Sequence, residues 1–321
     1  MHKILVALGI GLLTLTACSS SDLEDYQQAL IETSAYTSGV MTSALSVEIA
    51  FNEAGLDFES VRNLSYFEAI EVVTRTEYNS EADSTTAMID AYFNFGGMGF
   101  DMIYYMSGNE MLIKLPIIDK YIQLGYESSE EDKRQGDLRQ SMAIKKVIDE
   151  WNNVLNAEDV FSGSKAYILT DKGQIKTSTY QVVINQEQFQ VIKTALLSII
   201  ADEENVDAFL KDSEGMVDMA LDTVEIQTFM KEMIEAMSLE SFEGQAFVDF
   251  DGRLVKQIFT VALVNQEAMP GQIKSIHFTY ESGYDQLGNV APILIPTIEP
   301  SEMLEVDENR TIDDYFPEGI F

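Results

Sequence analysis

The chain has 321 residues and is strongly acidic, with 54 Asp or Glu residues, 20 Lys or Arg residues and a formal net charge of −34. Because 46% of the residues are hydrophobic, we expect a large buried core and not an acidic disordered chain. The charge excludes a nucleic-acid partner, since phosphates are bound by Lys and Arg. One cysteine cannot form an internal disulfide, and with two histidines we expect neither a metal centre nor a cofactor.

The N-terminal residues have the pattern of a signal peptide. Lys3 precedes an almost wholly apolar run over residues 4–16, which at about 1.5 Å per residue is too short for a bilayer core of roughly 30 Å. Residues 15–18 (LTAC) follow and resemble the lipobox of bacterial lipoproteins, in which the cysteine thiol receives a diacylglyceryl group. The alternative is an ordinary secretory signal in which Cys18 is incidental.

The lipobox resemblance implies a signal peptide over residues 1–17, then a lipidated tether and N-terminal helix over residues 18–39. It also implies a location on the extracytoplasmic face of the cell membrane, anchored through Cys18, because two acyl chains anchor stably where one does not. The mature chain loses Lys3 and no acidic residue, so its net charge is −35. An anionic membrane surface repels such a body, which we therefore expect to sit off the bilayer.

The first half of the mature chain predicts a helix and then a meander of strands. Ser21 or Asp22 can cap the helix. Alternation of apolar and polar residues predicts strands over 40–51, 69–78, 86–95, 99–106 and 111–115, with a loop between the first two. The short connections predict antiparallel hairpins, since parallel strands need a long crossover.

The second half predicts inserted helices and a closing set of strands. Helices are expected over residues 138–155, 186–200 and 214–238, and strands over 174–184, 243–250, 253–264, 272–280 and 291–295. An acidic tail covers residues 299–321. Because no linker interrupts the middle of the chain, we expect residues 40–298 to form one domain.

Two stretches carry a resemblance to a known family. The run from Tyr104 to Pro116 with residues 120–122, and the strand from Gly173 to Ile184 that enters a helix at Gln186, resemble the LolA-like superfamily of bacterial lipoprotein and lipid carriers, which includes the LppX/LprG type. The resemblance implies an α+β fold, a curved antiparallel sheet (half-open β-barrel) with helices packed on its concave face and acyl chains held between them. The lipid anchor and greater length depart from the free periplasmic carriers.

A stripe of methionines marks the helix over residues 214–238. Its apolar residues recur every three or four positions and include Met216, Met219, Ile226, Met230, Met233 and Met237. Methionine adapts to varied apolar shapes, so one interpretation is a lid that lines an acyl-chain cavity together with Phe100, Met102 and Tyr104 of a strand. The alternative, and the commoner use of such a stripe, is ordinary packing against the sheet.

No constellation of residues predicts catalysis. His277 alternates with apolar neighbours in a strand and is expected to face solvent, and no Gly-x-Ser-x-Gly motif occurs. Residues 162–165 (SGSK) match Ser-x-x-Lys without its companion motifs. Residues 249–252 (DFDG) lack the later ligands of a calcium loop and are better explained by a hairpin turn.

We therefore expect a membrane-anchored lipoprotein that binds a lipid or acyl-chain ligand for sequestration or transfer, without catalysis. One alternative is a non-enzymatic structural or sensor lipoprotein of the cell envelope, whose core is filled by its own side chains. The other is a hydrolase with an unfamiliar site. The sequence predicts neither the identity of a ligand nor a protein partner.

Overall fold

The structure is a computed structural model that describes residues 21–80, 85–108, 110–125, 143, 145–171, 173–202, 205–206 and 223–304. Several features named above lie outside the described residues, namely Cys18, Met216, Met219 and most of the acidic tail.

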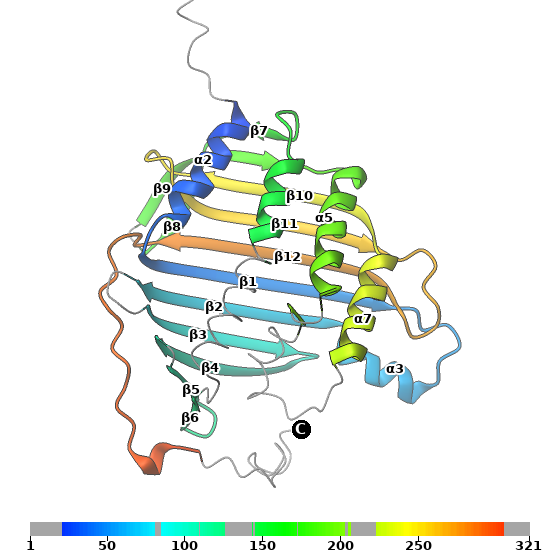
Figure 1. The fold of residues 1–321 in the computed structure, drawn as a ribbon, viewed down its shortest axis with the longest axis horizontal. Coiled ribbons are helices and arrows are strands. Elements are labelled where there is room, and N and C mark those ends of the chain that lie inside the picture. Colours follow the sequence, from blue (N-terminus) through cyan, green and yellow to red (C-terminus); the bar gives the residue numbers. More distant parts are fainter. Residues whose placement is uncertain are drawn as a thin grey trace, which may run out of the picture.

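The described residues contain twelve strands that form one curved sheet. In chain order they are β1 (Ser38–Phe51), β2 (Ala69–Asn79), β3 (Thr86–Phe95), β4 (Met98–Ser107), β5 (Glu110–Leu115), β6 (Lys120–Gly125), β7 (Val160–Ser162), β8 (Ala166–Thr170), β9 (Gly173–Val182), β10 (Ser238–Val248), β11 (Leu254–Val264) and β12 (Ile273–Asp285). The spatial order is β6-β5-β4-β3-β2-β1-β12-β11-β10-β9-β7, and β8 also pairs with β9 (Figure 1). All these ladders are antiparallel.

This topology confirms the predicted class, an α+β protein with a large antiparallel sheet. The chain builds one half as a meander from β1 to β6 and the other half from β9 to β12, and the first strand joins the last one where β1 pairs with β12. The two ends of the path, β6 and β7, do not pair with each other, so the described sheet is curved but not closed.

One predicted strand is wrong. Residues 291–295 form no strand, because Pro292 and Pro296 lack the N–H groups that a ladder needs. The segment instead runs across the ends of the strands, where the side chain of Asn79 donates to the carbonyl of Val290 (2.7 Å) and the backbone of Ile293 donates to Thr86 (3.2 Å).

Other elements were missed. The expected loop after β1 contains the helix α3 (Phe58–Ser65), whose N-cap Asp57 accepts a hydrogen bond from the backbone of Ser60 (2.8 Å). Strands β6, β7 and β8 were not predicted either; β7 and β8 are too short to show alternation, and β6 was missed although it is as long as β5.

Apart from α3, the described helices lie in front of the strands in Figure 1. They are α2 (Asp22–Ser34), a helix over residues 145–154, α5 (Gln186–Ile200) and α7 (Thr223–Ala236), with a 3-10 turn η1 (Pro300–Glu302) near the end. In Figure 1, α2, α5 and α7 all run in front of the strands, and the unlabelled green helix lies between α2 and α5. Each of these helices buries part of its surface toward the sheet or toward a neighbouring helix.

Helix α2 begins with a strong local signal. Ser21 accepts a hydrogen bond from the backbone of Glu24 (3.2 Å), and Glu24 accepts one from the backbone of Ser21 (3.1 Å), which is a capping box. Acidic residues in the first turn interact favourably with the positive end of the helix dipole. Tyr26, Ala29 and Thr33 are spaced by three and four residues and are buried, so one face of α2 packs on the sheet.

Two apolar clusters fill the face of the sheet that the helices cover. The larger one joins α2 to β9, β10 and β11 around Tyr26, Val182 and Leu254, which are at most 1% exposed. The second lies on β3, β4 and β5 around Ala91, Tyr104 and Ile113. The register connects them, because residues on one face run in rows from strand to strand across the whole sheet.

Candidate ligand-binding cavity

A cavity of about 1100 Å³ lies between the helices and the sheet. Helix α2 and its C-terminal end contribute Tyr26, Leu30, Ile31, Thr33 and Tyr36 to the wall. The helix over residues 145–154 and α5 contribute Val147, Ile148, Trp151, Asn152 and Ile192. The cavity is therefore bounded by three helices that are far apart in the sequence.

The floor of the cavity is one face of the sheet. It is formed by Leu45, Phe259, Val261, Phe278, Tyr280 and Tyr284, from β1, β11 and β12. The register explains why these residues meet, since Tyr280 lies opposite both Leu45 and Phe259, and Phe278 lies opposite Val261. Alternation along each strand turns these apolar and aromatic side chains toward the helices and the charged ones away.

Three aromatic rings form a cluster at this floor. The ring centroid of Trp151 lies 5.5 Å from Phe242 and 5.8 Å from Phe259, and the two phenyl rings are 5.8 Å apart. The Trp151–Phe259 pair is edge-on, with an interplanar angle of 77°. Such geometry adds about 0.5–1.5 kcal/mol per pair to the burial term. The cluster holds the helix over residues 145–154 against β10 and β11.

Gly244 of β10 makes room for this cluster. A Cβ atom at that position would lie 3.0 Å from the Cβ of Val182 and 3.2 Å from the ring of Phe259. The absence of a side chain therefore lets the Phe259 ring lie over the neighbouring strand, where it meets Trp151.

A row of uncharged polar residues crosses the same face. Gln257, Ser282, Ser43 and Thr74 are cross-strand partners on β11, β12, β1 and β2 in turn. Ser43 and Thr74 hydrogen-bond each other (2.6 Å), and Ser282 donates to the hydroxyl of Tyr284 (3.4 Å). We call these four residues the polar row. It borders the aromatic floor along the strands, one step beyond Phe259 and Tyr280.

Tyr26 is the buried contact between α2 and the polar row. Its side chain is 0% exposed, and its hydroxyl accepts a hydrogen bond from Nε2 of Gln257 (3.1 Å). Burial raises the pKa of Tyr26 to about 12, although hydrogen bonds from Trp151 and Gln257 oppose that shift. The phenol is therefore neutral at physiological pH, which suits a wall whose described lining residues carry no charge.

Further tyrosines line the cavity beside the polar row. Burial raises the pKa values of Tyr78 and Tyr280, and the neighbouring Tyr284 adds to both shifts. Tyr78 has room because its partner on β1 is Gly39, where a Cβ would come within 2.9 Å of the Tyr78 hydroxyl. We call Tyr36, Tyr78, Tyr280 and Tyr284 the tyrosine band; it presents uncharged hydroxyl groups.

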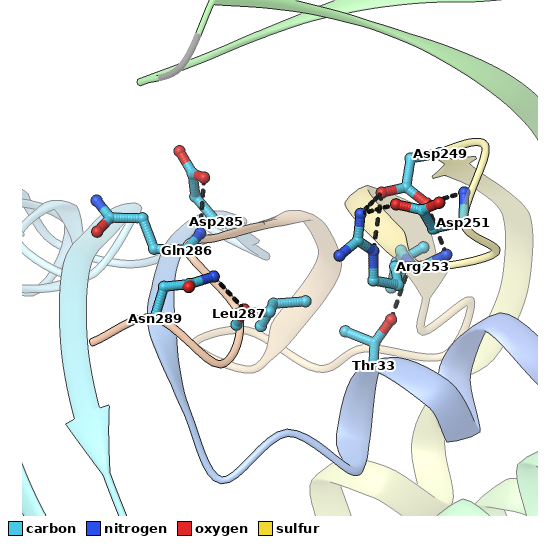
Figure 2. A network of polar contacts seen from close by, with 9 residues as sticks. Thr33, Asp249, Asp251, Arg253, Asp285, Gln286, Leu287 and Asn289 are labelled. Carbon is cyan, nitrogen blue, oxygen red and sulfur yellow. Dashed lines mark hydrogen bonds and ion pairs between the residues drawn. The ribbon is translucent and has the colours of Figure 1, made fainter. Parts of the chain in front are cut away.

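Polar contacts fix the C-terminal end of α2 to the β10–β11 hairpin (Figure 2). The backbone N–H of Leu254 donates to Oγ1 of Thr33 (2.8 Å). The next residue back, Arg253, forms ion pairs with Asp249 (2.8 Å) and with Asp251, and its side chain also hydrogen-bonds Tyr36. The charge of the Arg253 guanidinium, which contacts Tyr36, is thus neutralised by two carboxylates.

Two exposed apolar side chains mark the mouth of the cavity. Ile31 of α2 and Ile148 of the next helix both line the cavity, yet they are 61% and 52% exposed. Large apolar side chains at a cavity edge offer a continuous apolar path from the surface to the interior.

The predicted lining residues lie elsewhere. Met102 and Tyr104 belong to the second apolar cluster, where the Tyr104 hydroxyl contacts the sulfur of Met102 (3.0 Å), and Phe100 stacks on Phe93 with centroids 5.4 Å apart. The register puts Phe100, Met102 and Tyr104 on the same face as the cavity, several strands away. They are not among the described residues that line it.

The methionine stripe packs at the other end of the helical layer. Ile226, Met230 and Met233 of α7 are half-buried, and Met237 is 3% exposed just after the helix ends. Helix α7 contacts α5, and Nζ of Lys193 from α5 donates to the carbonyls of Glu235 (2.7 Å) and Met237 (2.8 Å). None of these four apolar residues belongs to the described cavity wall.

Two of the features weighed for catalysis or metal binding, His277 and the DFDG stretch, have the positions that the sequence predicted. His277 faces solvent as predicted, on the outer face of β12, with Nδ1 3.9 Å from Glu48. The DFDG stretch forms the hairpin turn that was expected, where Asp249 accepts from the backbone of Asp251 and of Arg253. Nowhere in the described chain do three or more His, Cys, Asp or Glu side chains gather as metal ligands.

None of the residues that line this cavity was predicted to line one, neither those of the sheet floor nor those of the helices. Tyr26, Leu30 and Trp151 each belong to an apolar stripe of their helix, but a stripe does not tell which partner it meets. A buried tyrosine next to apolar residues was the available signal, because such a hydroxyl needs a polar partner.

Comparison with known proteins adds no family. No protein-family model matches the chain, and no curated protein is significantly similar to it. Within the part of the chain that the structure describes, no helix is long and apolar enough to cross a membrane.

Proposed function

We propose that this protein is an extracytoplasmic lipoprotein, anchored to the cell membrane through Cys18, that binds an apolar ligand for sequestration or transfer and catalyses no reaction. With it we propose the finer architecture, a LolA-like half-barrel with helices on the concave face of the sheet. The observation that carries the proposal is a cavity of about 1100 Å³ whose described wall contains no charged side chain.

The size and chemistry of the cavity favour a long apolar molecule. Ligand pockets commonly have volumes of about 300–1,000 Å³, so this one can take more than a small metabolite. At about 0.8 kcal/mol per buried methylene, a chain of about sixteen carbons gains roughly 13 kcal/mol before the entropic costs of binding. Such a ligand needs few directional contacts, which fits a wall of aromatic and aliphatic side chains.

The proposed anchor also favours exchange with a membrane. Three residues separate Cys18 from the start of α2 at Asp22, and at about 3.5 Å per residue they span roughly 10 Å. Ile31 at the cavity mouth lies nine residues further along the helix, roughly 14 Å at 1.5 Å per residue. A lipid anchor on Cys18 therefore keeps the mouth within reach of the bilayer surface.

A binding experiment tests the proposal. Full-length protein with Cys18→Ala, which carries no acyl chains of its own, is analysed by native mass spectrometry before and after organic extraction and is titrated with an apolar fluorescent dye. We expect a copurified ligand that extraction removes, and saturable dye binding by the extracted protein. The double variant Leu45→Trp/Ile192→Trp fills the cavity from the floor and from α5 and should lose that binding.

The matched control is Val73→Trp. Val73 of β2 pairs with Ala44 of β1, the residue before Leu45. Its side chain lies on the other face of the sheet and is 38% exposed. Equal circular dichroism and unequal dye binding of the two variants would support the proposal. If neither a ligand nor saturable dye binding is found, the alternative of a structural or sensor lipoprotein is favoured.

A further inference from the structure

The wall of the cavity is uncharged in a protein that is otherwise rich in charge. Asp, Glu, Lys and Arg make up 23% of the sequence, yet none of the described lining residues is one of these or histidine. An ion that enters such a wall loses its hydration and finds no counter-charge, which makes its transfer strongly unfavourable.

The basic residue that contacts the cavity wall, Arg253, is already paired with carboxylates. Arg253 hydrogen-bonds Tyr36 of the tyrosine band, but its guanidinium is bound by both Asp249 and Asp251, as Figure 2 shows. It therefore offers no net positive charge to the carboxylate or phosphate of a ligand. The overall charge of −34 acts in the same direction and repels anions from the mouth.

The wall is nevertheless not uniformly apolar. Besides the aromatic cluster of Trp151, Phe242 and Phe259, the described wall contains Gln257 of the polar row and the hydroxyl groups of the tyrosine band. The two regions are adjacent along the strands, because Phe259 and Gln257 are separated by one residue of β11. Nearby, Asn152 adds a buried Oδ1 that has no hydrogen-bond partner.

We propose that the cavity selects uncharged amphiphiles, molecules with a long apolar chain and one neutral oxygen-bearing group such as an alcohol or an ester. The chain lies against the aromatic cluster, and the oxygen exchanges hydrogen bonds with the tyrosine band. The same chain with a carboxylate or an ammonium group is rejected. This inference rests on the proposed ligand-binding function and narrows it to one class of ligand.

A matched ligand series tests the selection. Dodecanol, methyl dodecanoate, dodecanoate and dodecylammonium share one chain and differ in charge. Each displaces a bound apolar dye from full-length Cys18→Ala protein, below its micelle concentration. About 0.5 M salt shortens the Debye length to a few Å, so that the field of the acidic surface does not decide the order. We expect the two neutral ligands to act at concentrations at least about tenfold lower than both charged ones.

The tyrosine band has its own test in the same assay. Tyr78→Phe/Tyr284→Phe removes two hydroxyls from the wall and should weaken dodecanol about five- to tenfold more than it weakens the apolar dye, which makes no hydrogen bond there. The control Tyr66→Phe/Tyr167→Phe removes two hydroxyls from tyrosines that are 46% and 65% exposed, and it should change neither.

The outcomes distinguish the selection for neutral ligands from the ligand-binding function itself. If all four ligands compete equally, or if dodecanoate is the strongest, the selection for neutral ligands is wrong while the ligand-binding function stands. If the dye does not bind at all, the ligand-binding function itself fails. If the neutral ligands displace the dye at lower concentrations but the tyrosine variant behaves like its control, the uncharged wall accounts for the selection. The assignment of the polar contact to the tyrosine band is then overturned.

Discussion

Nε2 of Gln257 donates a hydrogen bond of 3.1 Å to the hydroxyl oxygen of Tyr26, across a sequence separation of 231 residues. The bond joins the first described helix to a strand of the C-terminal half. Both groups are more than 90% buried, so the Gln257 amide would remain buried without this acceptor if the Tyr26 hydroxyl were removed. This pair therefore fixes the position of α2, and with it one wall of the cavity.

Removing the Tyr26 hydroxyl should destabilise the fold. Tyr26→Phe leaves the amide of Gln257 buried without its acceptor, and we expect the free energy of unfolding to fall by about 1–3 kcal/mol. Denaturant unfolding followed by the fluorescence of Trp151, the only tryptophan, measures the change. The double variant Tyr26→Phe/Gln257→Leu should recover part of the loss, because the amide of position 257 is then no longer buried without an acceptor.

The raised pKa of Tyr26 predicts a dependence of stability on alkaline pH. The folded protein holds this proton up to a pKa of about 12, whereas the unfolded chain releases it near the ordinary value of 10. Above pH 10 the unfolded state therefore binds fewer protons, and the free energy of unfolding falls as the pH rises toward 12. Tyr26→Phe should show a shallower fall than the exposed control Tyr66→Phe; equal slopes would contradict the assignment.

A side chain at position 244 should disturb the aromatic cluster. Gly244→Ala places a Cβ 3.0 Å from Val182 and 3.2 Å from Phe259, and we expect a loss of about 1–2 kcal/mol together with a changed Trp151 emission spectrum. Gly163→Ala is the matched control, since its Cβ would have its nearest neighbours at 3.6 Å, in ordinary contact. Because Gly→Ala by itself lowers the entropy of the unfolded chain and so favours folding, an equal loss in both variants would contradict the close approach at position 244 as its cause.

Lys193 should be important for the docking of α7. Its Nζ donates to two carbonyls at the C-terminus of α7, where a positive charge also complements the helix dipole. Lys193→Met should therefore lower the free energy of unfolding by about 1–3 kcal/mol. Lys231→Met removes the same charge from an exposed position on α7 and should cost little. Thermal unfolding of the two variants makes the comparison.

Cys18 should be needed for attachment to the membrane. Cys18→Ala removes the thiol that the LTAC motif presents, and we expect the protein to move from the membrane fraction to the soluble fraction. Ser20→Ala, two residues away, should stay with the membrane. Metabolic labelling with a radioactive fatty acid gives an independent readout, and labelling of the Cys18→Ala protein would overturn the lipobox assignment.

Local signals made several elements predictable. Strand β3 was expected at Thr86–Phe95 and α5 at Gln186–Ile200, and both have these bounds. Strict alternation sets the first, and the capping box of Asn185 and Gln188 starts the second. By contrast, Pro292 and Pro296 removed a strand that apolar residues alone had favoured.

The sequence by itself determined the class of the fold, the alternation of each long strand and the lipobox-like motif, because these depend on neighbours along the chain. Only the tertiary structure decided which helix faces enclose the cavity. In the sequence, α2 and α7 both show an apolar stripe at helical spacing, and the site was expected at the methionines of the second. Pairing of β1 with β12 and the contact of Tyr26 with Gln257 bring distant segments together, and long-range packing alone places the cavity beneath α2.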